Sequence, residues 1–198
     1  AVRASDDEHA AKMTRDFPAN GVYCLSLRLQ AKEWIRWLES AVEASRLLKD
    51  RRGESKALGN LALAYADLGE TRRAIELNEQ VLDIAREIAD RLVEGNALGN
   101  LGKAYADLGE TQRAIELYEQ DLDIAREIGN RRGEGYTLGN LGNVYVVLGE
   151  IQRAIKLYEQ HLDIAREIGD RRGEGKALGN LGNAYSELRE TQRAIELY

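Results

Sequence analysis

The residue types that most often carry catalysis or bind metals are scarce in this chain. It has two histidines, His9 and His161, and a single cysteine, Cys24. A zinc site or a Cys–His nucleophile needs several such side chains close together. Forty residues upstream of His161 the chain has Asp121, and forty further upstream Val81, so the repeats share no chemical role at this position. We therefore expect no enzyme activity, no metal and no cofactor, and we expect His161 at the surface or at a groove edge.

One glycine-rich stretch resembles a phosphate-binding loop. It has the sequence Gly-Glu-Gly-Lys and runs from Gly173 to Lys176. No strand pattern precedes it, Ala177 stands where such a loop needs Ser or Thr, and the glycines recur with a fixed period along the chain. A structural role is therefore the better interpretation of these glycines.

The composition favours an all-α protein. The chain has one proline in 198 residues, is rich in Ala, Leu, Glu and Arg, and lacks alternating runs of strand-forming residues. Its formal net charge of -6 provides no basic field for nucleic acid or an anionic membrane. No apolar stretch reaches the roughly 18 residues that a membrane span needs. The lone cysteine points to a reducing compartment, so we expect a cytoplasmic protein with neither a nucleic-acid nor a membrane partner.

A 40-residue repeat organises most of the chain. Residues 91–130 and 131–170 match at 28 of 40 positions without a gap, and residues 51–90 fall into the same frame. The residue pattern of each repeat predicts a first helix, a Gly-Glu turn and a second helix. In residues 91–130 the predicted second helix spans about residues 111–128. Apolar residues at three- and four-residue spacing give each second helix one apolar stripe. Since a helix pair cannot cover this stripe alone, neighbouring pairs must stack into a solenoid.

Glycines and short polar residues mark the predicted helix ends. The glycines after the first helices are Gly69, Gly109 and Gly149, and those after the second helices are Gly129 and Gly169. Glycine is favoured there because the helix ends on a left-handed residue. The residues that suit the N-cap of the next helix are Asp90, Asn130 and Asp170. Arg189 replaces the turn glycine in the last repeat, at a cost of about 1–2 kcal/mol, so we expect that turn to be distorted or frayed.

The repeat frame also predicts the domain layout. The array spans residues 51–198, with repeats at 51–90, 91–130 and 131–170 and a truncated repeat at 171–198. Residues 1–50 fit the frame less well, but Trp34 and Trp37 match the second-helix pattern after a shift of forty residues. This predicts a degenerate repeat or capping helices. Pro18 interrupts any helix from the N-terminus, so we expect a boundary there.

A short pattern recurs in the array. In the second repeat it consists of Leu101, Gly102, Tyr105, Gly109, Ala114 and Tyr118. This pattern resembles the signature of tetratricopeptide repeats. The tripeptide Leu-Gly-Asn, which begins at residues 58, 98, 138 and 178, is similar to the long-repeat branch found in Pins-type polarity adaptors and kinesin light chains. The resemblance implies a right-handed α-solenoid of stacked helix-turn-helix units, whose first helices line a concave groove for a protein or peptide ligand.

Differences between the repeats gather on one face of the first helices. At about 100° per residue, Asn96, Lys103 and Asp107 lie on the side opposite the repeated leucines. The variable positions that we assign to a peptide-binding groove are Lys56, Lys103, Tyr136, Val147 and Lys176. Tyr136, Val146 and Val147 are predicted to form an apolar pocket, and the lysines to meet acidic groups. The alternative is free drift on a solvated helix face, although drift rarely accumulates apolar residues.

One residue type on this variable face never changes. Asparagine occupies the equivalent positions Asn60, Asn100, Asn140 and Asn180, and Asn143 and Asn183 extend the row in later repeats. Its amide offers both a donor and an acceptor, which a sequence-independent grip on a peptide backbone requires. The resemblance implies the same role. The alternative is that each asparagine bonds to the neighbouring repeat and fixes the stacking angle.

These patterns favour a non-enzymatic scaffold that binds a peptide with acidic and apolar anchors. It could act alone or as the sensor part of a larger signalling protein. The alternative is a structural spacer or self-assembling array without a peptide ligand, associating through an open C-terminal repeat at Tyr198. The acidic balance disfavours a nucleic-acid reader, and the irregular first fifty residues disfavour an engineered consensus sequence.

Overall fold

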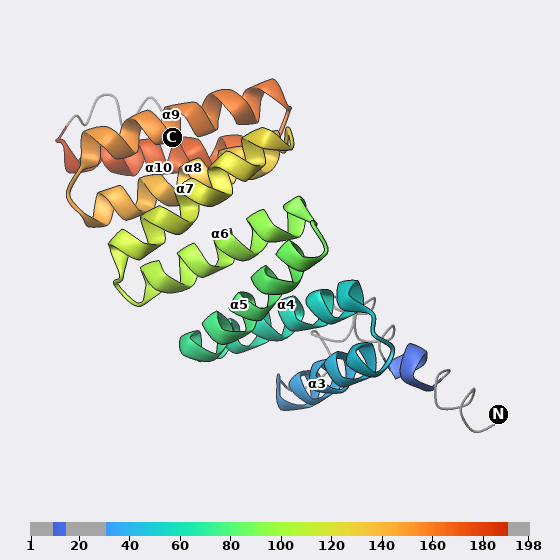
Figure 1. The fold of residues 1–198 in the computed structure, drawn as a ribbon. Helices are drawn as coiled ribbons and strands as arrows, with labels where there is room; N and C mark the ends of the chain where they lie inside the picture. The colour runs from blue at the N-terminus through green and yellow to red at the C-terminus, as the bar shows by residue number, and fades with distance from the viewer. Residues whose placement is uncertain (1–9, 15–30, 190–198) are drawn as a thin grey trace. The chain divides into compact units, whose positions relative to one another are not determined.

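A computed structural model describes residues 10–14 and 31–189, and these ranges contain helices joined by short turns (Figure 1). The helices after residues 10–14 are α3 (Ala31–Leu47), α4 (Arg51–Asp67), α5 (Thr71–Glu87), α6 (Arg91–Asp107), α7 (Thr111–Glu127), α8 (Arg131–Val147), α9 (Ile151–Glu167) and α10 (Arg171–Glu187). The predicted all-α class is confirmed. The positions of His9, Pro18, Cys24 and Tyr198 lie outside the described residues, together with the boundary and the open repeat predicted there.

The helices follow the 40-residue frame. The first helices α4, α6, α8 and α10 begin at Arg51, Arg91, Arg131 and Arg171, and α5, α7 and α9 are the second helices. Helix α3 lies forty residues before α5, in the place of a second helix. The chain forms two compact units, Ala1–Ala97 and Leu98–Tyr198. The division predicted between residues 50 and 51 stays a prediction.

In the first unit, α3 packs on α4 and α4 on α5. Apolar residues three or four positions apart turn one face of α3 inward. The resulting core contains Trp34, Ile35, Leu38, Leu61, Tyr65 and Ala74. Leu38 is fully buried, whereas Trp37 at the edge of this face is 43% exposed. Helix α3 thus supplies an apolar face to the first helix of the next repeat.

In the second unit, α8 contacts α7, α9 and α10, and α9 also packs on α10. The glycine of the recurring pattern makes room for the tyrosine of the second helix. A Cβ at Gly102 would lie 2.9 Å from Cδ1 of Tyr118, whose side chain is 2% exposed. The equivalent pair Gly142 and Tyr158 is packed in the same way. The glycine and the tyrosine of the pattern therefore form a close contact between the first and the second helix of a repeat.

The predicted glycine turns are confirmed. The five glycines that end helices have φ between 67° and 80°. Arg189 holds the same conformation with φ 60°, and its N–H donates to Ser186 O at 3.0 Å, as Gly149 N–H does to Val146 O at 2.9 Å. At Arg189 the expected distortion of the turn is therefore wrong. The backbone hydrogen bond maintains the turn there despite the steric cost of a side chain.

The predicted N-caps are also confirmed. The side chains of Asn130 and Asp170 accept hydrogen bonds from the N–H groups of Gly133 and Gly173 at 3.0 and 3.1 Å. Asp90 accepts from the N–H of Val93 at 3.2 Å. Each cap satisfies a backbone donor that the first turn of a helix leaves without a partner.

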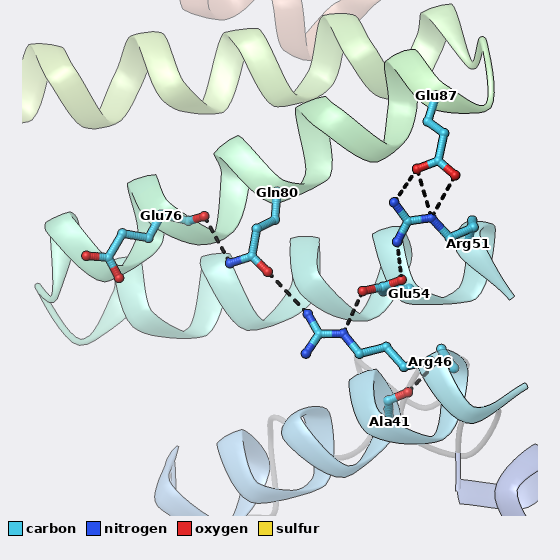
Figure 2. A network of polar contacts seen from close by, with 8 residues as sticks. Ala41, Arg46, Arg51, Glu54, Glu76, Gln80 and Glu87 are labelled. Atoms are coloured by element: carbon cyan, nitrogen blue, oxygen red, sulfur yellow. Dashed lines mark hydrogen bonds and ion pairs between the residues drawn. The ribbon is translucent and has the colours of Figure 1, made fainter. Parts of the chain in front are cut away.

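A glutamate, buried in α4, α6 and α8 and partly buried in α10, joins each first helix to the preceding second helix. In Figure 2, Glu54 accepts hydrogen bonds from Arg46 Nε of α3 at 2.7 Å and from Arg51 Nη1 of α4 at 2.6 Å. Arg51 also pairs with Glu87 of α5. The same Arg–Glu–Arg arrangement, which we call the ionic junction, recurs around Glu94, Glu134 and Glu174. The stacking of the helices is therefore fixed by charge-assisted hydrogen bonds as well as by apolar contacts.

Candidate functional site

The first-helix face assigned to ligand binding is exposed in both units. In the first unit Lys56 is exposed and Leu63 is 58% exposed, and in the second unit Lys103 is exposed and Val147 is 75% exposed. The leucines on the opposite side of the same helices, such as Leu138, are buried. The helical-wheel assignment of a core side and a solvent side is therefore confirmed.

A pocket of about 260 Å³ opens on this face in the second unit, between α6, α7 and α8. Its lining residues are Lys103, Ala106, Asp107, Thr111, Tyr118, Asn140, Asn143, Val144 and Val147. Four of them, Lys103, Asn140, Asn143 and Val147, are among the predicted site residues. The fold thus brings part of the predicted set together in one concave place, which combines apolar side chains with polar groups able to donate hydrogen bonds.

Tyr136 and Val146 do not line this pocket with Val147, so the apolar pocket predicted from these three residues is not formed. Tyr136 lies three turns earlier in α8, about 16 Å along the helix axis. Its hydroxyl donates to Asp170 Oδ2 at 3.2 Å, and Lys176 Nζ lies 4.9 Å from the centre of its ring. Tyr136 and Lys176 therefore contribute to the contact between successive repeats. The prediction failed because a helical wheel shows direction but not distance along the axis.

The asparagines have different surroundings. In the first unit, Asn60 Nδ2 is buried without a hydrogen-bond partner among the described residues. In the second unit, Asn180 Nδ2 donates to Asn143 Oδ1 at 3.5 Å, which connects α10 to α8 as the stacking alternative requires. The side chains of Asn100 and Asn183 are exposed. A ligand-binding role for the asparagine row stays a prediction.

His161 is buried, with 4% of its surface exposed, so its expected place at the surface or at a groove edge is wrong. Two glycines of α8 make room for the imidazole. A Cβ at Gly139 would lie 2.9 Å from its Nδ1, and one at Gly135 would lie 3.0 Å from its Cδ2. Burial lowers the pKa of His161, the charge of Lys176 lowers it further, and Asp170 opposes the shift. Burial in the helix packing therefore favours the neutral form of the imidazole.

Asp121 occupies the same position one repeat earlier and is partly buried. A Cβ at Gly99 would lie 2.9 Å from its Oδ2, and the same oxygen accepts a hydrogen bond from Thr137 Oγ1 at 2.6 Å. Burial raises the pKa of Asp121 to about 6, and the Thr137 hydrogen bond limits the shift. Sequence reasoning missed this buried carboxyl group. The available signal was Thr137, which stands where the other first helices have alanine.

The sequence matches the family described as "Tetratricopeptide repeat" over residues 53–127 and 133–198, which is most of the chain. The chain belongs to the tetratricopeptide repeat family. The predicted resemblance is thereby confirmed, and the ionic junction, the glycine turns and the Gly–Tyr contacts are features of this chain's tetratricopeptide stacking. No curated protein matches the chain.

Several solved structures share the tetratricopeptide fold of this chain. A kinesin light chain candidate from Podosopora anserina has nearly identical repeats within itself; it is 24% identical to this chain with a TM-score of 0.68, over 98% of this chain and 91% of that one. A Rap protein complexed with competence and sporulation factor is 18% identical with a TM-score of 0.81, over 94% of this chain and 52% of that one. A signal transduction ATPase from Pyrococcus horikoshii, with a tetratricopeptide repeat sensor, is 18% identical with a TM-score of 0.79, over 96% of this chain and 30% of that one.

Among residues 10–14 and 31–189, no three His, Cys, Asp or Glu side chains are grouped so that they could hold a metal ion. Within the same ranges, no helix has the length and apolar character needed to cross a membrane.

Proposed function

We propose that this chain binds a peptide, or an extended segment of a partner protein, on the exposed face of its first helices. Its family and its structural neighbours support the broader role of a protein-interaction scaffold. The groove residues that belong to the proposal are the asparagine row, the lysines Lys56, Lys103 and Lys176, and the pocket around Val147. Binding needs no catalytic group, so the proposal is for a non-enzymatic protein.

The observation that carries the proposal is the contrast between two sides of the same helices. Leu61, Leu101, Leu141 and Leu181 are identical between repeats and buried. The residue two positions further along each helix is exposed, and its type changes between the repeats. The residues at this position are Leu63, Lys103, Asn143 and Asn183, so only the last two repeats share a type. A constant core with a varied lining is what selective recognition on a shared scaffold requires.

The neighbours support a sensing role. The Rap protein was solved in complex with competence and sporulation factor, and the Pyrococcus horikoshii ATPase has a repeat array as its sensor. By analogy we propose that this chain is the recognition part of a signalling protein. A single cysteine in 198 residues agrees with a cytoplasmic location, which belongs to the same proposal.

The test is selection from a random peptide display library. The purified chain is compared with a variant that carries Asn100→Ala, Asn140→Ala and Asn180→Ala. A matched control changes three exposed second-helix residues, Glu119, Asp123 and Lys156, to alanine. Circular dichroism confirms that all three proteins are equally helical.

We expect the wild-type chain and the control to enrich the same sequences and the asparagine variant to lose them. Equal enrichment by all three proteins would place binding away from the asparagine row. No enrichment by any protein would overturn the peptide-binding proposal and favour a spacer or a self-assembling array. Sedimentation at several protein concentrations would then distinguish these two roles.

A further inference from the structure

Helix α8 contacts an ionisable side chain of the second helix on each side of it. Thr137 Oγ1 of α8 lies 2.6 Å from Asp121 Oδ2 of α7. Two positions away in each direction along α8, Gly135 and Gly139 enclose His161 of α9. The two ionisable side chains occupy the same position of successive repeats, but one is an acid and the other a base. The two contacts of α8 can therefore respond differently to a proton.

The contact with α7 is complete when Asp121 is protonated. Thr137 Oγ1 lies 2.6 Å from Asp121 Oδ2 and 3.0 Å from Gly133 O. A hydroxyl group has one hydrogen, so Thr137 can donate to only one of these two oxygens. A neutral Asp121 removes the competition, because its own O–H donates to Thr137 and the Thr137 hydroxyl then donates to Gly133 O. Ionisation of Asp121 breaks this chain of hydrogen bonds and leaves a negative charge in a partly buried place.

The surroundings of Asp121 favour its neutral form. On the α6 side the carboxyl group lies against Gly99, and on the α8 side it lies against Thr137; neither side chain carries a charge. Tyr118 lies one turn earlier in α7, and burial raises its pKa, so it stays neutral. Burial raises the pKa of Asp121 to about 6, from 3.8. The carboxyl group is therefore neutral in mildly acidic solution and ionised at neutral pH.

The contact with α9 is complete when His161 is neutral. Its Nδ1 is buried and has no hydrogen-bond partner among the described residues. A neutral imidazole can leave this nitrogen without a proton, whereas the protonated ring must place an N–H there without an acceptor. On the α8 side the ring lies 5.7 Å from the ring of Tyr136. On the α10 side the charge of Lys176 opposes a second positive charge, and Asp170, which favours it, already accepts a hydrogen bond from Arg132. Protonation therefore adds to this contact a buried charge and a donor without an acceptor.

The first unit shows the same position without an ionisable group. Val81 of α5 takes the place of Asp121 and His161, and it is 5% exposed. Thr137 is likewise particular to α8, since the other first helices have alanine there. Packing alone therefore does not require an acid or a base at this position. The two ionisable groups lie in the two second helices that flank α8.

We propose that α8 is a pH-responsive element: acidification strengthens its contact with α7 and weakens its contact with α9, and a rise in pH has the reverse effect. The folded-state pKa of Asp121 is raised to about 6, so the contact with α7 loses stability as pH rises from about 4 to about 6. The folded-state pKa of His161 is lowered from 6.5, so the contact with α9 loses stability as pH falls below 6.5.

The same helix carries much of the candidate site. The residues that α8 supplies to the pocket on the first-helix face are Asn140, Asn143, Val144 and Val147. A change in how α8 is held by its neighbours therefore acts on the helix that lines this pocket. The inference goes beyond the proposed function, because it concerns the contacts of α8 and does not depend on the identity of any ligand.

The experiment measures backbone hydrogen exchange in α7 and α9 between about pH 4.5 and about pH 7.5, corrected for the intrinsic effect of pH on exchange. Asp121→Asn keeps the shape of the side chain and a donor for Thr137 but cannot ionise. His161→Val copies Val81 of the first unit. Asp123→Asn, which changes an exposed residue of α7, is the matched control.

In the wild-type chain we expect the protection of α7 against exchange to fall about tenfold as pH rises across this range, and the protection of α9 to rise. Asp121→Asn should abolish only the response of α7, His161→Val only the response of α9, and Asp123→Asn neither. Responses of the same sign in α7 and α9, or responses that persist when the ionisable group is removed, would overturn the proposal.

A direct titration keeps the test decisive if a variant does not fold. NMR follows the carboxyl carbon of Asp121 and the ring signals of His161 in the wild-type chain. We expect a midpoint near 6 for Asp121 and a midpoint below 6.5 for His161. A midpoint near 3.8 for Asp121, or one at or above 6.5 for His161, would overturn the opposed response of the two contacts.

Discussion

Replacement of Glu134 by glutamine removes one charge from an ionic junction and leaves the shape of the side chain almost unchanged. Glu134 is 6% exposed and joins Arg126 of α7 to Arg131 of α8. Arg126 Nε donates to its Oε1 at 2.9 Å, and Arg131 donates to its Oε2. The amide of glutamine keeps one acceptor and turns the other into a donor that faces an arginine.

The expected cost follows from this geometry. A hydrogen bond to a charged group contributes about 1.5–3 kcal/mol to the free energy of unfolding. The two arginine side chains are 49% and 40% exposed, so water can solvate them when the carboxylate is lost. We therefore expect Glu134→Gln to lower the free energy of unfolding by about 2 kcal/mol, below the sum of two full bonds.

Glu167→Gln is the matched control, because Glu167 pairs with the same Arg131 but is 57% exposed. We expect it to cost about 0–1 kcal/mol, as for other exposed pairs. Urea denaturation followed by circular dichroism measures both changes against the wild-type chain. Equal costs for the two substitutions, or a Glu134→Gln cost below about 0.5 kcal/mol, would refute a stabilising role for the buried junction.

Three further predictions concern buried groups and turns. Because burial raises the folded-state pKa of Asp121 to about 6, from 3.8, the folded chain loses stability as pH rises from about 4 to 7; Asp121→Asn should abolish about 2 kcal/mol of this loss in pH-dependent denaturation. Gly139→Ala should lower the melting temperature, because the new Cβ would meet His161, and adding His161→Val to this variant should restore it. Gly59→Ala should raise the melting temperature, because a Cβ at Gly59 would have no atom within 4 Å and alanine favours the helix. Arg189→Gly should add about 1 kcal/mol to the free energy of unfolding, because φ is 60° there.

Much of the fold could be predicted from the sequence because its signals are local. A glycine at a helix end, such as Gly109, needs only its own backbone angle, and a cap such as Asn130 needs only the next turn. Because the sequence repeats, a prediction made for one helix pair applies to the other helix pairs as well. Arg189 shows the limit of the local rule, since the hydrogen bond of the turn outweighs the steric preference.

The site was predicted less completely because it depends on distances between helices. The sequence predicts His161 at the surface, because the close approach of Gly135 and Gly139 on the facing helix, which encloses the imidazole, has no signal in its own repeat. Tyr136 and Val147 share one side of α8 but lie at separate places along it. Sequence periodicity gives the direction of a side chain, whereas pocket membership requires its position along the axis as well.

The ionic junction has a consequence for how such an array changes over time. Each junction uses the same two arginines and one glutamate at the same offset, so every repeat offers the same connector to its neighbours. Repeats with identical connectors can be duplicated, deleted or exchanged by recombination without new contacts having to arise. Such a chain can lengthen, or change the order of the varied residues on its first-helix face, while the contacts that join its repeats stay the same.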